Sequence, residues 1–266
     1  MRTRDHEAED LLGAVRAAAL RAGAAIVHVA DAGAHATRSK GDRSPLTAAD
    51  LAANAILVDA LRALDPRTLI ISEETPYEPA ALPERFWLVD PLDGTREFLA
   101  GNGEYTVNVA LVERGVPVLG VVHAPASGVT YAAARGAGAT RTDGTGERAI
   151  RVRCDGPLAV VASRSHRSPL LDAFLAALPP HAIVSLGSSL KFCLVADGTA
   201  HLYPRLGPTF WWDTAAAHAV ILEAGGSVTA LDGAPLRYAG EDLRNPPFVC
   251  SSLPRTAWKA GALAIA

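Results

Sequence analysis

The stretch WLVDPLDGTREF, residues 87–98, places Asp90 and Asp93 directly after an apolar run that is typical of a buried β-strand. Two interpretations are open, because Asp-Gly is a common turn dipeptide and two carboxylates at a strand end can also hold a cation. Gly94 permits a backbone conformation that other residues resist, so both carboxylates and the Leu92 carbonyl between them could point at one cation. The stretch alone does not choose between a turn and a cation site.

Three further acidic residues stand at the ends of expected elements. Glu73 follows the strand-like run LIIS, and Asp213 stands at the start of the helix-like segment FWWDTAAAHAV. The plainer interpretations are solvated surface for Glu73 and an N-cap for Asp213. The plainer interpretation of Asp50 is a helix cap, because Thr47 and Asp50 show the spacing of a helix capping box. Carboxylates gathered at the ends of buried strands need a cation or protons, but periodicity does not show that these segments meet.

The apolar periodicity predicts a mixed α/β architecture, with two lobes of sheet and helix around one cleft. Helical spacing marks residues 8–30 and 44–64, and the polar stretch 31–44 is expected to be a loop. The expected strands cover residues 68–72, 86–90, 106–113, 118–125, 130–134, 158–163, 182–187 and 200–205. The expected C-terminal helices cover residues 168–178, 188–198 and 214–226, and residues 135–148 are expected to form an exposed hairpin connection.

The composition limits the classes of protein to consider. The chain has 266 residues, 49% of them hydrophobic, which is enough to bury a substantial core. Its 25 basic and 28 acidic residues argue against a nucleic-acid coat, so an anionic ligand must be met by local charge. Three separated cysteines without a CxxC motif favour a reduced, cytosolic protein. We expect neither a membrane-spanning segment nor a secretory signal.

Several separated motifs, in order, resemble the inositol monophosphatase superfamily of magnesium-dependent, lithium-sensitive phosphatases. They are SEE, WLVDPLDGTREF, GEYTVNVALV and WDTAAAHAV. Within that superfamily, RSHRS, GSSLKFCLVADG and LYPRLGPT resemble the 3'(2'),5'-bisphosphate nucleotidases, and the likeness covers nearly the whole chain. The resemblance implies a layered αβαβα sandwich and one catalytic unit over residues 1–266. Its N-terminal lobe, about 1–155, would carry most metal ligands, and its C-terminal lobe, about 156–266, would carry Asp213 and substrate contacts.

The same resemblance implies Mg²⁺ as the cofactor, with two or three ions bound. The implied metal ligands are Glu73, Asp90, Leu92 through its carbonyl, Asp93 and Asp213. Asp90 would be shared between the first ion and the second. Asp50 and Thr95 match the pair that positions and deprotonates the attacking water, which is the work that two-metal phosphate hydrolysis requires of the protein.

The implied substrate contacts extend this set toward a second phosphate. They are Glu73, Leu92, Asp93, Gly94, Thr95, His166, Ser188, Lys191, Arg205 and Asp213. Taken alone, Lys191 and Arg205 are ordinary surface charges, and only their match to nucleotide-contacting positions favours a role. One of Trp211 and Trp212 could line a nucleoside pocket, although core packing is the expected role of both.

The resemblance therefore implies hydrolysis of adenosine 3',5'-bisphosphate to AMP and phosphate, a clearance step of sulfate assimilation. Adenosine 3'-phosphate 5'-phosphosulfate is a further implied substrate. The alternatives are an inositol or fructose bisphosphate phosphatase, and a binding protein that keeps the fold but has lost the chemistry. A missing metal acid would favour the binding protein, and none is missing. We expect a small nucleotide as the partner, no nucleic acid, no obligate protein partner and a monomer or homodimer. The expected location is the cytoplasm, with a peripheral place at the inner face of the cell membrane left open.

Overall fold

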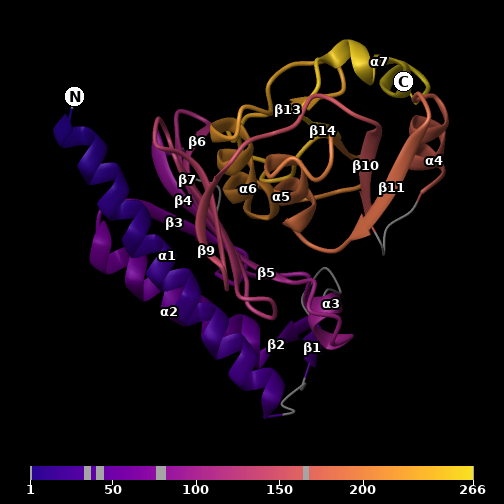
Figure 1. Cartoon of the computed structure of the whole chain (residues 1–266). Helices are drawn as coiled ribbons and strands as arrows, with labels where there is room; N and C mark the ends of the chain where they lie inside the picture. The colour runs from indigo at the N-terminus through magenta and orange to yellow at the C-terminus, as the bar shows by residue number, and fades with distance from the viewer. Residues whose placement is uncertain (1, 33–36, 40–44, 76–81, 164–167, 266) are drawn as a thin grey trace.

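Five layers of helix and sheet follow one another across the molecule (Figure 1). The computed structural model describes residues 2–32, 37–39, 45–75, 82–163 and 168–265. A pair of helices covers one face of a seven-stranded sheet, two helices fill the middle, and a five-stranded sheet with short outer helices completes the stack. The expected αβαβα sandwich is confirmed.

The outer layer consists of α1 (Arg2–Asp31) and α2 (Ala48–Leu64), which lie along each other. Both bury one apolar stripe against the seven-stranded sheet, including Val15 and Ile26 of α1. The capping box at the start of α2 is present, since the Thr47 side chain accepts from the backbone and Asp50 bonds back to it. The loop expected between these helices is partly wrong, because β1 (Thr37–Ser39) pairs with β2 (Pro45–Thr47).

The seven-stranded sheet carries the apolar runs of the N-terminal half. Its strands, in spatial order, are β3 (Leu69–Ser72), β4 (Arg85–Asp93), β5 (Thr106–Glu113), β6 (Val116–Ala124), β7 (Val129–Ala134), β8 (Gly138–Asp143) and β9 (Gly146–Ile150). β3 pairs parallel with β4, and all later neighbours pair antiparallel. The stretch 135–148 is therefore more than a connection, because β8 and β9 extend the sheet as a paired hairpin.

The middle layer consists of α5 (Leu190–Ala196) and α6 (Trp211–Glu223), both of which pack into the main core cluster. Helix α6 lies close against β6 at Gly120, where a Cβ atom would come 2.1 Å from the carbonyl oxygen of Ala216. Only glycine permits that approach of helix backbone to strand. The approach places the N-terminal turn of α6, which carries Asp213, beside the ends of β4 and β5.

The second sheet stands on the far side of α5 and α6. Its strands, in spatial order, are β11 (His181–Leu186), β10 (Leu158–Ser163), β12 (Leu202–Arg205), β14 (Phe248–Ser251) and β13 (Ser227–Ala230). The helices α4 (Pro169–Ala176), η1 (Arg255–Ala257) and α7 (Lys259–Leu263) lie on its outer side. Four elements after residue 226 were not predicted from the sequence, namely β13, β14, η1 and α7.

One helix tests the expectation that no segment could span a membrane. Residues 7–31 of α1 are long and apolar enough to do so by length and composition, so that expectation is wrong by this measure. This is weak evidence for a membrane span, since a core helix of a soluble protein passes the same test of length and composition. The apolar stripe of α1 packs on the seven-stranded sheet.

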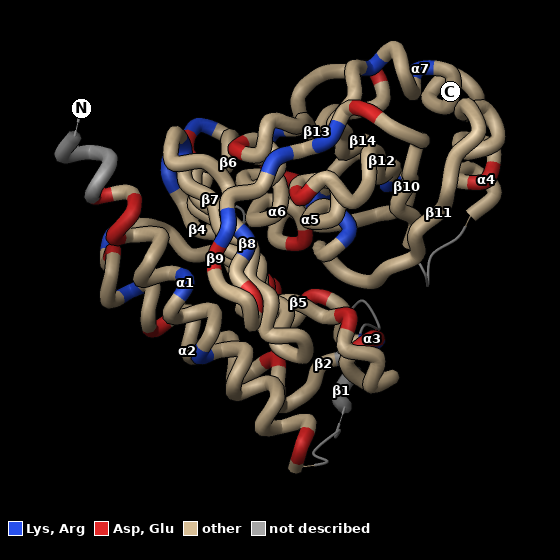
Figure 2. The backbone as a smooth tube through the Cα atoms, in the orientation of Figure 1, with Lys and Arg blue, Asp and Glu red and all other residues tan. Residues whose placement is uncertain are grey.

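Acidic and basic residues are interspersed along the described chain, over the N-terminal helices and both sheets (Figure 2). This pattern agrees with the nearly balanced charge count of 25 basic and 28 acidic residues. An anion would therefore have to be recognised by a few local side chains rather than by a broad electrostatic field.

Candidate functional site

The end of β4 leaves the regular sheet at the quoted motif. The register with β5 shifts between Asp90 and Asp93, so the residues between them bulge out of the ladder. The backbone N–H of Leu92 donates to Asp90 Oδ1 at 3.0 Å, which fixes the buried carboxylate. Gly94 then takes a left-handed conformation, φ 91°, and starts the short helix α3 (Thr95–Leu99). The turn at Gly94 and the two aspartates therefore belong to one bulge at the end of β4.

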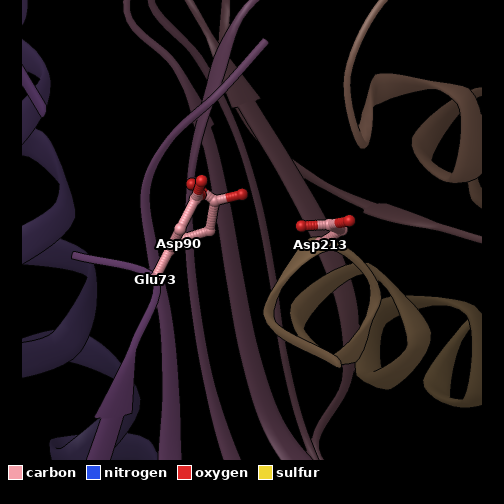
Figure 3. A group of neighbouring side chains, drawn as sticks. All are labelled: Glu73, Asp90 and Asp213. Atoms are coloured by element: carbon pink, nitrogen blue, oxygen red, sulfur yellow. The ribbon is translucent and has the colours of Figure 1, made fainter. Parts of the chain in front are cut away.

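Three carboxylates meet at this strand end from three separate elements. Glu73 follows β3, Asp90 belongs to β4 and Asp213 is the third residue of α6. Each offers a ligand oxygen, and these oxygens all lie within 4.8 Å of one another. Figure 3 shows Glu73 and Asp90 side by side, with Asp213 facing them from the helix. Oxygen donors at this spacing suit a hard divalent cation such as Mg²⁺.

Burial and mutual repulsion keep Asp90 and Asp213 from ionising easily. Burial raises the pKa of Asp90 well above its ordinary value, and the charges of Glu73 and Asp93 raise it further. Burial likewise raises the pKa of Asp213, again with Asp93 and Glu73 adding to the effect. Buried carboxyl groups that ionise with difficulty are stabilised in their ionised form when a cation takes the place of their protons. The cluster thus fits a bound metal both in its donor atoms and in its electrostatics.

Asp93 lies beside the cluster with a different set of partners. Its carboxylate accepts the backbone N–H of Ser189 at 2.5 Å, which ties the bulge of β4 to the start of α5. Burial raises its pKa to about 6, while Lys191 and the Ser189 hydrogen bond lower it. The predicted ligand Asp93 therefore faces the same cleft but is partly committed to the neighbouring helix.

Asp213 is not the N-cap of α6, but its carboxylate holds the backbone of the residue that is. The N-cap residue of α6 is Phe210, and Asp213 stands in the first turn. Its carboxylate accepts the Phe210 backbone N–H at 2.8 Å. One carboxylate oxygen thus holds the helix start while the group faces Glu73 and Asp90.

Asp50 caps α2 with one carboxylate oxygen and faces Thr95 with the other. Its Oδ2 accepts from the Thr47 backbone N–H at 2.7 Å and from the Thr47 hydroxyl at 2.5 Å, which completes the cap of α2. Its Oδ1 lies 3.4 Å from the Thr95 hydroxyl. That hydroxyl also lies 3.3 Å from the Leu92 carbonyl oxygen, and its single hydrogen can serve one acceptor at a time.

These residues open into a cleft of about 320 Å³ between the two sheets. The sequence-predicted residues along its wall are Glu73, Asp90, Leu92, Asp93, Gly94, Thr95, Ser188, Lys191, Arg205 and Asp213. Asp50 lies behind this wall and reaches it through Thr95. His166 lies outside the described residues. Of the predicted substrate contacts, all except His166 are therefore gathered in one cleft.

Lys191 is not the ordinary surface charge that it resembles in isolation. Its side chain is buried, and its ammonium group donates to the Ser188 carbonyl and lies 5.6 Å from the centroid of the Tyr203 ring. Burial lowers its pKa to about 8, against the opposing effect of Asp93. A buried cation in the wall of a cleft is a good partner for an incoming anion.

Arg205 is the last residue of β12 and lines the same cleft as the acids. One guanidinium nitrogen, Nη2, donates to the Pro208 carbonyl at 2.9 Å. The buried Nε atom has no hydrogen-bond partner among the described residues. Its remaining donors are available for an oxygen-rich ligand.

Comparison with known proteins agrees with this geometry. The model of the Inositol monophosphatase family matches residues 7–265. The chain belongs to the inositol monophosphatase family.

Among relatives in this family, the 3'(2'),5'-bisphosphate nucleotidase CysQ of Escherichia coli K12 is 51% identical over 213 residues, 79% of this chain and 86% of that protein. Among solved structures, CysQ from Bacteroides thetaiotaomicron superposes with a TM-score of 0.81 and 37% identity, covering 91% of this chain and 97% of that one. An inositol monophosphatase from Anabaena superposes with a TM-score of 0.77 and 26% identity, covering 97% and 95%. The resemblance stated from the motifs is confirmed.

Sequence reasoning missed part of the cleft wall of this family member. Phe210 and Trp212 stack at 4.9 Å between ring centroids, with an interplanar angle of 9°, and both line the cleft. Core packing was expected of both tryptophans, but only Trp211 lies in the core, at 2% exposure. Phe210, Trp211 and Trp212 are three consecutive aromatics, so the sequence carries no signal that separates the buried one from the two that line the cleft.

Proposed function

We propose that the chain is a Mg²⁺-dependent phosphatase that hydrolyses adenosine 3',5'-bisphosphate to AMP and phosphate. The coarser assignment, an enzyme acting on 3'(2'),5'-bisphosphate nucleotides, follows from the 51% identity to the E. coli enzyme. The observation that carries the finer proposal is the cleft itself. It is lined both by a cluster of three acids and by the cations Lys191 and Arg205, which belong to α5 and β12. This arrangement offers one place for a metal-bound phosphate and one for a second phosphate.

The acids would hold the cofactor. Glu73, Asp90 and Asp213 form the core of the metal set, with Asp93 and the Leu92 carbonyl as the further ligands of a site for two or three ions. When bound, the ions supply Lewis-acid activation of water and neutralise charge on the phosphate oxygens. The protein's part is to hold these oxygens rigidly at a strand end, a bulge and a helix start.

Asp50 and Thr95 would orient the attacking water and take its proton. The Thr95 hydroxyl is within reach of Asp50 and opens into the cleft, so a proton can pass from the water to Thr95 as Thr95 passes its own to Asp50. Asp50 is prepared for this by Thr47, which holds Oδ2 and leaves Oδ1 directed at Thr95. No Ser, Cys or His nucleophile is needed in this scheme.

Lys191 and Arg205 would bind the phosphate that is not cleaved, with Ser188 and His166 as further contacts. Ser188 takes a left-handed conformation, φ 45°, next to the buried lysine. Glu73, Leu92, Asp93, Gly94, Thr95 and Asp213 would contact the phosphate that is cleaved. The stacked pair Phe210 and Trp212 forms an apolar surface in the same cleft that suits a purine.

The cellular role would be clearance of this bisphosphate during sulfate assimilation, with adenosine 3'-phosphate 5'-phosphosulfate as a second substrate. We place the enzyme in the cytoplasm. The alternative is a peripheral location at the inner face of the cell membrane. It would work as one catalytic unit over residues 1–266, with lobes at about 1–155 and 156–266, as a monomer or homodimer.

A phosphate-release screen tests the proposal. Purified protein is assayed on adenosine 3',5'-bisphosphate, adenosine 3'-phosphate 5'-phosphosulfate, inositol 1-phosphate and fructose 1,6-bisphosphate, with Mg²⁺ or with excess chelator. We expect the nucleotides to give the highest kcat/KM and chelator to abolish release. A preference for inositol 1-phosphate or fructose 1,6-bisphosphate would overturn the nucleotidase proposal in favour of an inositol or fructose bisphosphate phosphatase. Full activity in chelator would remove the metal from the proposal.

A further inference from the structure

Asn245 lies behind the cleft and is hydrogen-bonded to the segment that carries Asp213. It precedes β14 and is 9% exposed. Its amide nitrogen Nδ2 lies 2.7 Å from the Phe210 carbonyl oxygen and 3.1 Å from each of the hydroxyls of Thr209 and Thr214. Its three partners all line the cleft. One buried amide thus holds the chain on both sides of Asp213.

The chemistry of the partners fixes which way this amide points. A peptide carbonyl oxygen can only accept, so the nitrogen of Asn245 must be the atom that faces Phe210. The other half of the amide, Oδ1, is buried and has no hydrogen-bond partner among the described residues. An unpaired buried carbonyl costs stability, so the whole amide is a poor choice for stability alone. What it supplies is a directed pair of N–H donors.

The backbone of Asn245 reaches the carboxylate more directly. Its N–H donates to the Thr209 carbonyl at 2.8 Å. The same peptide group presents the Phe210 N–H to Asp213 at 2.8 Å, since the carbonyl and N–H of a trans peptide point in opposite directions. The Asn245 side chain anchors the next peptide group through the Phe210 carbonyl. Both peptide groups that flank Phe210 are therefore held by one residue.

We propose that Asn245 is a positioning residue that sets the Asp213 carboxylate for cation binding. It acts through the two peptide groups of Phe210. Loss of its side chain would release the Phe210 carbonyl and the Thr209 and Thr214 hydroxyls, which would let the Asp213 carboxylate turn away from Glu73 and Asp90 without removing any ligand. The inference rests on the proposed function, in which Asp213 is a metal ligand. Groups that orient metal ligands in this way are typically worth about 10- to 100-fold in metal affinity.

Tyr238 offers a matched control. It is fully buried, and its hydroxyl donates to the same Thr214 hydroxyl at 3.1 Å. Its other partner within the described chain is His218 Nδ1, at 3.1 Å. Tyr238→Phe therefore removes a buried hydrogen bond from the same network while leaving the hold of Asn245 on Phe210 intact.

The experiment measures Mn²⁺ binding to the whole protein without substrate, by the loss of the free-ion electron paramagnetic resonance signal, together with thermal unfolding. We expect Asn245→Ala to weaken Mn²⁺ binding by about 10-fold or more, and Tyr238→Phe to change it by less than about twofold, although both lower the melting temperature. Asn245→Leu, which has a similar volume but no N–H donors and no charge, serves where Asn245→Ala does not fold.

Each result decides between the two proposals. Unchanged Mn²⁺ affinity in the Asn245 variants, or an equal loss in Tyr238→Phe, overturns the positioning role and leaves the proposed function standing. A wild-type protein that binds no Mn²⁺ overturns both. Loss of affinity confined to the Asn245 variants supports the role.

Discussion

The Thr95 hydroxyl lies 3.4 Å from Oδ1 of Asp50, although the two residues are 45 positions apart in sequence. The other oxygen of the same carboxylate is held by Thr47 at the cap of α2. A capping role and a contact with Thr95 are therefore compatible for Asp50. Oδ2 of its carboxylate accepts from Thr47, and Oδ1 faces Thr95. The cap fixes the oxygen that faces Thr95.

Asp50→Asn separates these roles. An amide oxygen can still accept from Thr47, so we expect a stability loss of about 1 kcal/mol or less. The amide cannot take up a proton, so kcat should fall by about 100-fold or more. Thr95→Val should lower kcat similarly. The control is Tyr131→Phe, which removes a hydrogen bond to Asp197 outside the residues that line the cleft and should lower the melting temperature without changing kcat. A normal kcat in Asp50→Asn would leave the residue as a cap alone.

Removal of the cluster acids should abolish metal-dependent catalysis. Glu73→Gln, Asp90→Asn and Asp213→Asn each remove a charge from a group whose oxygens lie within 4.8 Å. We expect losses of several orders of magnitude in kcat/KM, with folding retained, and recovery of the wild-type enzyme from chelator on addition of Mg²⁺. Ca²⁺ should restore little activity, because its coordination is larger and less rigid. Circular dichroism is the check that the variants fold.

The same cluster should weaken the metal-free protein at neutral pH. The raised pKa values of Asp90 and Asp213, and that of Asp93 at about 6, mean that the folded chain keeps protons which the unfolded chain has released. Their contribution to stability is therefore present below their ordinary pKa of 3.8 and is lost as the pH rises through the raised values.

Asp90→Asn makes this visible. Without metal, we expect the variant to melt several degrees above the wild type at pH 7.5, and this advantage to shrink as the pH falls toward 4. The comparison cancels the opposite contribution of His218, whose pKa burial lowers to about 3. Added Mg²⁺ should reverse the order by stabilising the wild type alone. A variant that is less stable than the metal-free wild type at every pH would contradict the repulsion argument.

Arg205→Ala tests the binding of the phosphate that is not cleaved. A charge-assisted hydrogen bond is worth about 1.5–3 kcal/mol, so kcat/KM for adenosine 3',5'-bisphosphate should fall by about 10- to 150-fold. Inositol 1-phosphate hydrolysis should change little, since it has no second phosphate. Lys191→Ala should act in the same direction but also affect the metal site, because Lys191 lowers the pKa of Asp93. Arg135→Ala, an exposed arginine paired with Glu113, is the control for a lost charge.

Trp212→Ala tests the aromatic wall. Stacking on a base is worth about 1–3 kcal/mol, so KM for the nucleotide should rise by about 5- to 150-fold, with kcat less affected. Trp212→Phe keeps a ring and should retain most of the affinity. Phosphate release from inositol 1-phosphate is the internal reference. Equal losses on both substrates would mean that Trp212 supports the helix start rather than the base.

The sequence by itself determined the elements and their order wherever the pattern was local. The strands β3 to β7 and β10 to β12, the helices α1, α2, α4, α5 and α6, and the capping box of Thr47 and Asp50 were all predicted from periodicity or spacing. The motifs also identified the family, because several of them in one order are specific. The weak signals were short or polar: β1, the hairpin of β8 and β9, and the elements after residue 226.

Only the tertiary structure decided which of the chemical groups meet. Glu73, Asp90 and Asp213 come from distant parts of the chain, and the close approach of α6 to Gly120 brings the third acid to the other two. Asn245 carries no motif, and its contact with Phe210 follows from how the end of the chain returns beside α6. Periodicity reports which face of an element is buried, but not what is packed against it. The site is therefore a property of long-range packing.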